Sequence, residues 1–381
     1  MCGISGYLSF GAKPDDWEKQ LQAMAQCLAH RGPDDAGYWY DSKAGIGLGH
    51  RRLAVLDLSP AGHQPMFSSS GRYIVTYNGE LYNFREIREL LEQQGHSFKG
   101  SSDTEVLLAA MDEWGFSEAL PKFVGMYAFA LWDKGRRVLH LVRDRMGEKP
   151  LYYGWQGDAF LFGSELKALR AHAQWKGQID RQALELFLRH SYVPTPYSIY
   201  EGIRKLPPGS VLGLTEAQAR SRSLPEPRTY WSLKKLAEAG QSYAFQGSEN
   251  DAIDEFDRLL SHAVQGQMVA DVPVGAFLSG GVDSSAVVAL MQSHSSRPVK
   301  TFTIGFVDPT YNEADYAKKV ARHLGTEHTE LYVTPKETLE VIPRLPEIYD
   351  EPFADHSQIP TFLISQLARR EVTVSLSGDG G

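Results

Sequence analysis

The sequence predicts two units that follow one another along the chain, an α+β unit of mixed order and then an α/β unit with a parallel sheet. Its 381 residues are enough for two or three domains. Short strand-like runs with helical patterns between them occupy residues 1 to about 165. Beyond about residue 270 the pattern changes to a regular alternation of strand and helix. Such alternation favours a parallel sheet covered by helices on both faces, with ligands at the carboxyl ends of the strands.

The first unit is predicted as a sheet-and-helix domain of mixed order. Apolar and aromatic runs predict strands at 72–77, 126–132 and 137–142. Apolar residues at helical spacing predict helices at 84–94 and 103–114. We place this domain at residues 2–190.

A proline-rich stretch follows and is predicted to connect the two units. Because each proline lacks a backbone donor and has a fixed φ, a long helix or a central strand is not expected there. The prolines stand at positions 194, 196, 207, 208, 225 and 227. We place the connector at residues 191–247 and the second unit at residues 248–381.

The second unit is predicted from its strand and helix order. We expect strands at 272–278, 300–305, 328–333 and 372–376, helices from 284 and from 313, and helical stretches at 336–349 and 360–370. The chain ends directly after a strand, where a loop and a helix are expected, so the sequence predicts that the domain continues beyond residue 381.

The composition argues against several classes of protein. With 39 Lys and Arg against 47 Asp and Glu, the net charge of −8 argues against nucleic acid as a partner. The two cysteines, Cys2 and Cys27, are too few for a disulfide framework, and their spacing is not that of a zinc site. No signal sequence and no apolar run of about 18 residues occurs, so we expect a cytoplasmic protein with no membrane partner.

Cys2 is the first candidate catalytic residue. Removal of Met1 would place a thiol and a free α-amine on one residue. The amine, with a reference pKa of about 7.7–8.0, is then the base that takes the proton of the thiol. The alternative is that Cys2 is a small buried apolar residue at the start of a strand.

Two further segments carry charged groups suited to a substrate. The segment 49–57, GHRRLAVLD, places guanidinium groups beside a β-rich run, and such a fork can hold a carboxylate in two hydrogen bonds. The segment 30–35, HRGPDD, predicts a rigid charged loop that orders over the site. The alternative for Arg52 is a solvated surface charge.

Two more segments offer hydrogen-bonding groups. In 76–83, TYNGELYN, a strand is predicted to end in an Asn78–Gly79 turn, whose amide side chain and backbone N–H point the same way. Those are the donors that an oxyanion needs. In 101–105, SSDTE, a helix begins and Asp103 is placed to receive a substrate ammonium. The alternatives are a plain hairpin turn and a helix cap. Neither alternative accounts for the presence of a cysteine at position 2.

Together these motifs resemble a known family. MCGISG, RGPDD, GHRRLAVLD, YNGELYN, SSDTEV and FGSELKAL resemble the glutaminase domain of class II glutamine amidotransferases, in the form found in glutamine-hydrolysing asparagine synthetases. The resemblance covers the whole chain. It implies the four-layered αββα sandwich of the N-terminal nucleophile hydrolases.

The resemblance also implies roles for individual residues. Cys2 attacks the glutamine side-chain amide, and Asn78 and Gly79 form the oxyanion hole. Arg52 and Asp103 hold the backbone groups of glutamine. The implied glutamine pocket is lined by Arg52, Leu53, Ala54, Val55, Leu56, Asn78, Gly79, Glu80 and Asp103.

The segment 277–285, FLSGGVDSS, is predicted to bind phosphate. It lies between an apolar strand and a helix, and Gly280 and Gly281 let backbone N–H groups turn toward an anion at the helix N-terminus. Neither GxxxxGK[ST] nor GxGxxG is present, which argues against a Walker-type kinase and a dinucleotide oxidoreductase. The alternative is an ordinary glycine-rich turn before a helix.

SGGVDSS resembles the PP-loop of ATP pyrophosphatases, which cleave ATP between its α and β phosphates. The resemblance implies ATP and Mg²⁺ as cofactors, with Asp283 helping to hold the metal. The implied ATP site consists of Leu278, Ser279, Gly280, Gly281, Asp283, Ser284, Ser285, Ile304, Ser377 and Gly378. Asp379 stands where related synthetases often carry a glutamate proposed as a base during ammonia attack.

The sequence therefore predicts a two-site amidotransferase that most simply converts aspartate to asparagine, with glutamine, ATP and the acceptor as small-molecule partners and a possible homodimer. The segment 350–360, DEPFADHSQIP, resembles variants found among surface-polysaccharide genes, so a different carboxylate acceptor is an alternative. Two other hypotheses are a pyrophosphatase that uses external ammonia and a binding module without turnover.

Overall fold

The computed structural model describes residues 1–10, 16–306 and 312–379. The chain divides into two compact units. The first comprises Met1–Tyr243 together with the short segment Asp350–Phe353, and the second comprises Ala244–Tyr349 and the chain from Ala354 onward. The segment Asp350–Phe353 therefore lies with the first unit although its neighbours in sequence belong to the second.

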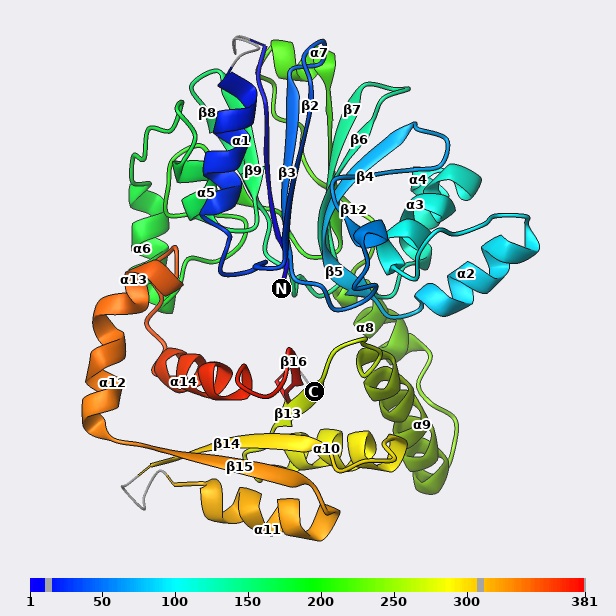
Figure 1. Ribbon diagram of the computed structural model, residues 1–381, viewed down its shortest axis with the longest axis vertical. Coiled ribbons are helices and arrows are strands. Elements are labelled where there is room, and N and C mark those ends of the chain that lie inside the picture. Colours follow the sequence, from blue (N-terminus) through cyan, green and yellow to red (C-terminus); the bar gives the residue numbers. More distant parts are fainter. Residues whose placement is uncertain (11–15, 307–311, 380–381) are drawn as a thin grey trace. The chain divides into compact units, whose positions relative to one another are not determined.

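Two antiparallel six-stranded sheets form the centre of the first unit (Figure 1). The first sheet has the order β10-β8-β9-β1-β3-β2 and the second the order β12-β11-β7-β6-β5-β4. The strands of the first sheet are β1 (Gly3–Leu8), β2 (Asp35–Asp41), β3 (Ile46–Arg52), β8 (Tyr152–Gln156), β9 (Ala159–Gly163) and β10 (Ile203–Lys205). Those of the second are β4 (Met66–Phe67), β5 (Tyr73–Leu81), β6 (Gly125–Asp133), β7 (Val138–Arg143), β11 (Ser210–Thr215) and β12 (Arg228–Thr229).

The main core of this unit lies between the two sheets. Ile4 and Leu48 of the first sheet join Ile74, Trp132 and Leu141 of the second in one fully buried cluster. Because strand side chains alternate between faces, each sheet also presents an outer face that needs a cover. Helices supply it, and the unit is a four-layered αββα sandwich (Figure 1).

The helices divide between the two outer faces. On the first sheet, Leu21 and Met24 of α1 (Trp17–Gln26) and Leu166 of α5 (Leu166–Arg170) pack with Tyr7 and Leu161. On the second, α3 (Asp103–Trp114) packs on β5 and on α2 (Phe84–Gln93). The remaining helices of this unit are α4 (Phe116–Ala119), α6 (Arg181–His190), α7 (Glu216–Arg220) and α8 (Leu233–Ser242).

The stretch 191–247, predicted as a connector, differs in the structure. It carries β10 and β11, which are hydrogen-bonded into the two sheets, and the first unit extends to Tyr243. Pro207 and Pro208 lie in the turn between these strands and do not interrupt either of them. The number of prolines in the stretch therefore led to a wrong prediction, because two short strands fit between the proline positions.

The second unit is built on a four-stranded parallel sheet with the order β15-β14-β13-β16, as its strand and helix alternation predicts. Its strands are β13 (Val274–Phe277), β14 (Lys300–Phe306), β15 (Glu327–Val333) and β16 (Val374–Leu376). Its helices are α9 (Glu249–Gln267), α10 (Val282–His294), α11 (Ala314–Leu324), α12 (Pro335–Val341), α13 (Leu345–Ile348) and α14 (Gln358–Ala368). One face of the sheet packs with α9, α10 and α11, and the other with α14.

In the described part of the chain, no helix combines the length and the apolar composition that a bilayer span requires.

The inter-sheet core predicts a clear mutational contrast. Leu141→Ala removes a side chain that is 0 % exposed between the sheets, and we expect it to lower the free energy of unfolding by about 2–5 kcal/mol. Leu188→Ala on α6 changes a side chain that is 76 % exposed and should cost less than about 0.5 kcal/mol. Urea unfolding followed by tryptophan fluorescence measures both, and equal losses would contradict this core assignment.

Candidate active site

A pocket in the first unit is lined by most of the residues predicted to bind glutamine. It encloses about 340 Å³, including its open mouth. Its lining residues are Cys2, Arg52, Leu53, Val55, Leu56, Gly62, Gln64, Tyr77, Gly79, Glu80, Ser102, Asp103 and Thr104. Ala54 and Asn78, which were predicted with their neighbours, are absent from this lining, and the Ala54 N–H donates instead to Asp34 Oδ2 at 2.8 Å.

The thiol of Cys2 lies at the start of β1, against the end of β3. The Leu53 N–H donates to Cys2 Sγ at 3.4 Å, and Sγ lies 3.6 Å from the Leu53 carbonyl. Burial raises the pKa of the Cys2 thiol, while the hydrogen bond with Leu53 and the nearby amino terminus lower it. Burial also lowers the pKa of the α-amine of Met1 to about 5. This amine is therefore neutral at pH 7, but it belongs to Met1, and the nitrogen of Cys2 becomes an amine only when Met1 is removed.

Asn78 and Gly79 lie within a strand, and the turn predicted for them is wrong. β5 continues through both residues, and they pair with Ala128 and Tyr127 of β6. A Cβ on Gly79 would lie 2.3 Å from the Met126 carbonyl oxygen, so the close approach of β6 requires glycine there. Pairing along the whole of β6 outweighs the local turn preference of the Asn–Gly dipeptide.

The amide of Asn78 is the least satisfied polar group near the pocket. The side chain is 1 % exposed, and neither Nδ2 nor Oδ1 has a hydrogen-bond partner among the residues that the structure describes. A buried amide without partners costs about 1–3 kcal/mol. Such a group is expected where a ligand completes the bonding.

Two hydrogen bonds between the sheets hold this part of β5. Thr76 Oγ1 donates to the Gly49 carbonyl at 3.1 Å, and His50 Nε2 lies 3.0 Å from the Tyr77 carbonyl. Burial lowers the pKa of His50 to about 4, so its ring is neutral at pH 7. These bonds tie β5 to β3 near the end of β3, where the backbone of Leu53 contacts Cys2.

Asp103 is a buried carboxylate in the pocket wall. Its Oδ2 accepts hydrogen bonds from Tyr77 Oη at 3.0 Å and from the Leu81 N–H at 2.8 Å. Burial raises its pKa, and the bonds from Leu81 and Tyr77 oppose that shift. Asp103 does not cap α3, because the cap is Ser102, whose hydroxyl accepts from the Glu105 N–H.

Arg52 is buried in the pocket wall and is not a solvated surface charge. Its guanidinium donates to the backbone carbonyls of Ser59, at 3.0 Å, Leu56, at 3.4 Å, and Asp57. These bonds use three of its five N–H groups. A carboxylate ligand therefore has to bind the remaining N–H groups or displace one of the carbonyls.

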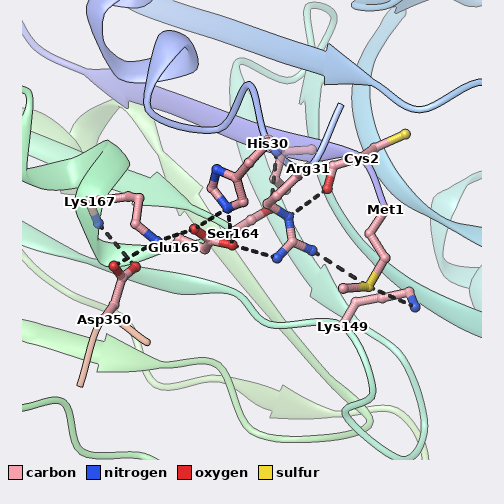
Figure 2. Close-up of polar contacts among 10 residues, drawn as sticks. Met1, Cys2, His30, Arg31, Lys149, Ser164, Glu165, Lys167 and Asp350 are labelled. Carbon is pink, nitrogen blue, oxygen red and sulfur yellow. Dashed lines mark hydrogen bonds and ion pairs between the residues drawn. The ribbon is translucent and has the colours of Figure 1, made fainter. Parts of the chain in front are cut away.

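The loop 30–35 contacts the site from one side. Arg31 Nε donates to the Cys2 carbonyl at 2.9 Å, and the Asp34 N–H donates to the Arg52 carbonyl at 2.9 Å. Figure 2 shows the Arg31 guanidinium reaching from this loop to the backbone of Cys2. The predicted charged loop thus adjoins the candidate nucleophile through its backbone.

Several residues of the pocket carry no sequence signal of their own. Gln64 Oε1 accepts from the Tyr77 N–H at 2.7 Å, and Gln64 Nε2 donates to Thr104 Oγ1 at 3.4 Å. Gln64 belongs to no recognised motif, and Thr104 was signalled only as part of the SSDTEV segment. Tyr77 was signalled only as part of the TYNGELYN segment.

The predicted phosphate loop lies between β13 and α10 in the second unit. Gly280 has φ +83°, and a Cβ there would lie 2.7 Å from the Ala317 backbone nitrogen. Ser279 Oγ and Ser284 Oγ are 3.0 Å apart. Gly281 is the N-cap of α10 and provides no side-chain cap, so the first N–H groups of this helix are available to an anion.

Of the other residues predicted to bind the nucleotide, Gly378 adjoins this loop. A Cβ on Gly378 would lie 2.7 Å from the Ser284 backbone nitrogen, so the segment after β16 passes directly beside the start of α10. Ser377 Oγ accepts from the exposed Asp379 N–H at 3.3 Å. Leu278 follows β13, and its N–H donates to the Phe302 carbonyl of β14, two residues before Ile304.

The described residues contain no group of three or more His, Cys, Asp or Glu side chains that could hold a metal ion. Asp283 alone is an exposed carboxylate in the first turn of α10. Mg²⁺ commonly binds through one or two carboxylates together with substrate phosphates, and a single carboxylate beside a phosphate loop fits that donor set.

Comparison with known proteins gives matches over both units. A family model described as a glutamine amidotransferase domain matches residues 1–231, and one described as asparagine synthase matches residues 255–381. A Methanocaldococcus jannaschii protein named as a candidate glutamine-hydrolysing asparagine synthetase is 38% identical, over 100% of this chain and 74% of its own length. Asparagine synthetase [glutamine-hydrolyzing] 1 of Bacillus subtilis is 36% identical, over 100% of this chain and 58% of its own. The chain thus spans less than two thirds of that relative.

Among solved structures, glutamine phosphoribosylpyrophosphate amidotransferase of B. subtilis superposes with a TM-score of 0.44 and 17% identity, over 86% of this chain and 65% of its own. A TM-score this low carries no argument about the fold. The two antiparallel sheets define the fold directly.

The unpartnered amide of Asn78 predicts an unusual stability effect. Asn78→Leu keeps the branching of the side chain and removes two unsatisfied polar atoms, so the free energy of unfolding should stay equal or rise by up to about 2 kcal/mol. Gln64→Met is the matched control, because it leaves the buried Tyr77 N–H unpaired and should cost about 1–3 kcal/mol. Chemical denaturation measures both, and a large loss for Asn78→Leu would show that the amide has a structural partner.

Proposed function

The chain belongs to the family of glutamine-hydrolysing asparagine synthetases, and from this premise we propose that it transfers the amide nitrogen of glutamine to an ATP-activated carboxylate. One observation carries the proposal: the Cys2 thiol lines the same pocket as Arg52 and Asp103, and between the lining residues Tyr77 and Gly79 stands Asn78, whose buried amide has no partner among the described residues. A thiol nucleophile, oxyanion donors and a pair of opposite charges are what an amino-acid amide requires.

In the first step, the free amine of the mature Cys2 takes the thiol proton, and the sulfur adds to the amide carbonyl of glutamine. Asn78 Nδ2 and the backbone N–H of Gly79 stabilise the negative oxygen of the tetrahedral intermediate. Collapse of the intermediate releases ammonia and leaves a thioester on Cys2. Water then hydrolyses the thioester to glutamate and regenerates the thiol.

Charge complementarity orients the substrate in this pocket. Asp103 receives the α-ammonium of glutamine and Arg52 the α-carboxylate. Leu53, Val55, Leu56 and Glu80 complete the wall. Ala54 supports this wall through its bond to Asp34 and is not proposed as a contact residue.

In the second step, an acceptor carboxylate displaces pyrophosphate from the α-phosphorus of ATP. Ammonia then attacks the acyl carbon and AMP leaves. We assign pyrophosphate to the loop from Ser279 to Ser285 and the start of α10, the nucleotide to Leu278, Ile304, Ser377 and Gly378, and a base role during ammonia attack to Asp379. Mg²⁺, held by Asp283 and the phosphates, would offset phosphate charge when bound.

Aspartate is the acceptor that we propose, because the relatives matching the whole chain are named asparagine synthetases. A different carboxylate is the second candidate, favoured by the segment 350–360. We further propose a cytoplasmic location, because the thiols of Cys2 and Cys27 are both free and such thiols persist in a reducing compartment. The homodimer implied by the family resemblance stays a prediction.

Substitution of Cys2 tests the proposed function. Cys2→Ala should abolish glutamine-dependent formation of glutamate and pyrophosphate, by at least about 10³-fold, because the nucleophile is lost. Ammonia-dependent pyrophosphate release should continue at the wild-type rate. Ammonia-dependent turnover with no glutamine-dependent turnover in either protein would favour a pyrophosphatase that uses external ammonia. Absence of both products would favour a binding module.

The bond between Tyr77 and Asp103 predicts a shift in pH dependence. Asp103 binds ammonium only when it is ionised, and the Tyr77 hydroxyl lowers the Asp103 pKa against the opposite effect of burial. Tyr77→Phe removes that bond, so the Asp103 pKa rises further and the KM for glutamine should begin to increase at a higher pH as the solution is acidified.

The matched control is Tyr73→Phe. Tyr73 is buried on the same strand, and Asp103 is not among the groups that shift its pKa. Its pH profile of KM should coincide with that of the wild type. Identical profiles for Tyr77→Phe and the wild type would argue against an ammonium at Asp103.

A further inference from the structure

A chain of alternating charges leads from the backbone of Cys2 to the segment Asp350–Phe353 (Figure 2). Its members in order are Arg31, Glu165, Lys167 and Asp350. The proposed mechanism uses none of them. All four lie in the first unit, although Asp350 is far from the others in sequence.

The first link fixes the backbone of the nucleophile. Arg31 Nε donates to the Cys2 carbonyl at 2.9 Å, and Arg31 Nη1 donates to Glu165 Oε1 at 2.8 Å. The Arg31 side chain is only 7% exposed, so its charge depends on a partner of opposite sign. Glu165 is that partner.

Glu165 is held from several sides. Although burial raises its pKa, hydrogen bonds from His30 and Lys167 and the charge of Arg31 lower it to about 2, so Glu165 is ionised at neutral pH. Lys167 Nζ lies 2.5 Å from Glu165 Oε2. The neighbouring Ser164 exchanges two hydrogen bonds with Ile4 of β1, at 3.0 and 2.9 Å. The carboxylate is therefore fixed relative to the strand that begins beside Cys2.

Asp350 closes the chain of charges. Its Oδ1 lies 3.0 Å from Lys167 Nζ, and its Oδ2 accepts from the Lys167 backbone N–H at 3.1 Å. The Asp350 side chain is 7% exposed. Lys167 thus bonds Glu165 and Asp350 at once, and its own orientation depends on both carboxylates.

We propose that Glu165 and Asp350 are positioning residues for glutamine hydrolysis, which hold Arg31 on the carbonyl of Cys2 and so align the thiol and amine of that residue. The inference rests on the proposed function. Since Tyr349 and Ala354 belong to the second unit, Asp350 makes the hydrolysis rate at Cys2 depend on a segment joined on both sides to the ATP-binding half of the chain.

The kinetic signature follows from where the chain of charges acts. Arg31 contacts the backbone of Cys2 and none of the charged groups proposed to hold glutamine. Loss of its orientation should therefore lower kcat and leave the KM for glutamine within about twofold. A general loss of packing would change the amount of folded protein and not this split.

The test compares Glu165→Gln, Asp350→Asn and Glu351→Gln in the whole chain, measured as glutamate release without ATP or acceptor. Glu351 is the matched control. It anchors the same segment, 2.5 Å from Lys205 Nζ and 2.8 Å from the Ile199 nitrogen, but has no bond to Lys167 or Glu165. Thermal unfolding of each variant confirms that it is folded.

We expect kcat to fall about tenfold in Glu165→Gln, equivalent to about 1.4 kcal/mol of transition-state stabilisation, and about threefold or more in Asp350→Asn. Glu351→Gln should stay within about twofold of the wild type. The double variant Glu165→Gln/Asp350→Asn should lose less than the product of the single losses, because both act through Lys167.

Unchanged kcat in Glu165→Gln and Asp350→Asn would overturn the inference, as would an equal loss in Glu351→Gln. If Glu165→Gln does not fold, Asp350→Asn decides, because it leaves the pair between Arg31 and Glu165 intact. A wild-type chain without glutaminase activity would overturn the proposed function itself, which distinguishes the two failures.

Discussion

The hydrogen bonds between β3 and β5 are the constraint on which the pocket depends. Thr76 donates to the Gly49 carbonyl, and His50 bonds the carbonyl of Tyr77. Just after the end of β3, the backbone of Leu53 contacts the Cys2 thiol. On β5, Tyr77 is followed by Asn78, whose amide has no partner among the described residues. A slip of β5 by one residue would turn the Asn78 side chain to the opposite face. The neutral state of the buried His50 ring lets this bond form without burying a charge.

Burial then sets the chemistry of the groups in this pocket. It lowers the pKa of the terminal amine and raises the pKa of the Cys2 thiol and of the Asp103 carboxyl. The same burial leaves the Asn78 amide unsatisfied, so the site carries a cost in stability that a bound oxyanion would offset. Stability and function are opposed at that residue.

Much of this architecture could be predicted from the sequence, since strand and helix patterns and motifs are local. The pocket unites Cys2, Arg52 and Asp103 as the motifs indicated, and the parallel sheet follows from strand and helix alternation. The errors have tertiary causes. Asn78–Gly79 looks like a turn until β6 pairs along it. The prolines of residues 191–247 argued against strands in that stretch. They lie outside β10 and β11, so both strands form. Glu165 stands in a recognised motif, but only folding brings Asp350 to the lysine it shares.

We propose that a thiol and a free amine on residue 2 act on a glutamine amide in this pocket. Peptide mass mapping after incubation with a diazoketone analogue of glutamine tests it most directly, because the reagent alkylates the attacking sulfur, and Cys27, a second free thiol, is an internal control. We expect an amino-terminal peptide that begins at Cys2 and carries one adduct. Cys27 should stay unmodified, and excess glutamine should protect Cys2 from the reagent. A retained Met1, an unmodified Cys2 or equal labelling of Cys27 would contradict it.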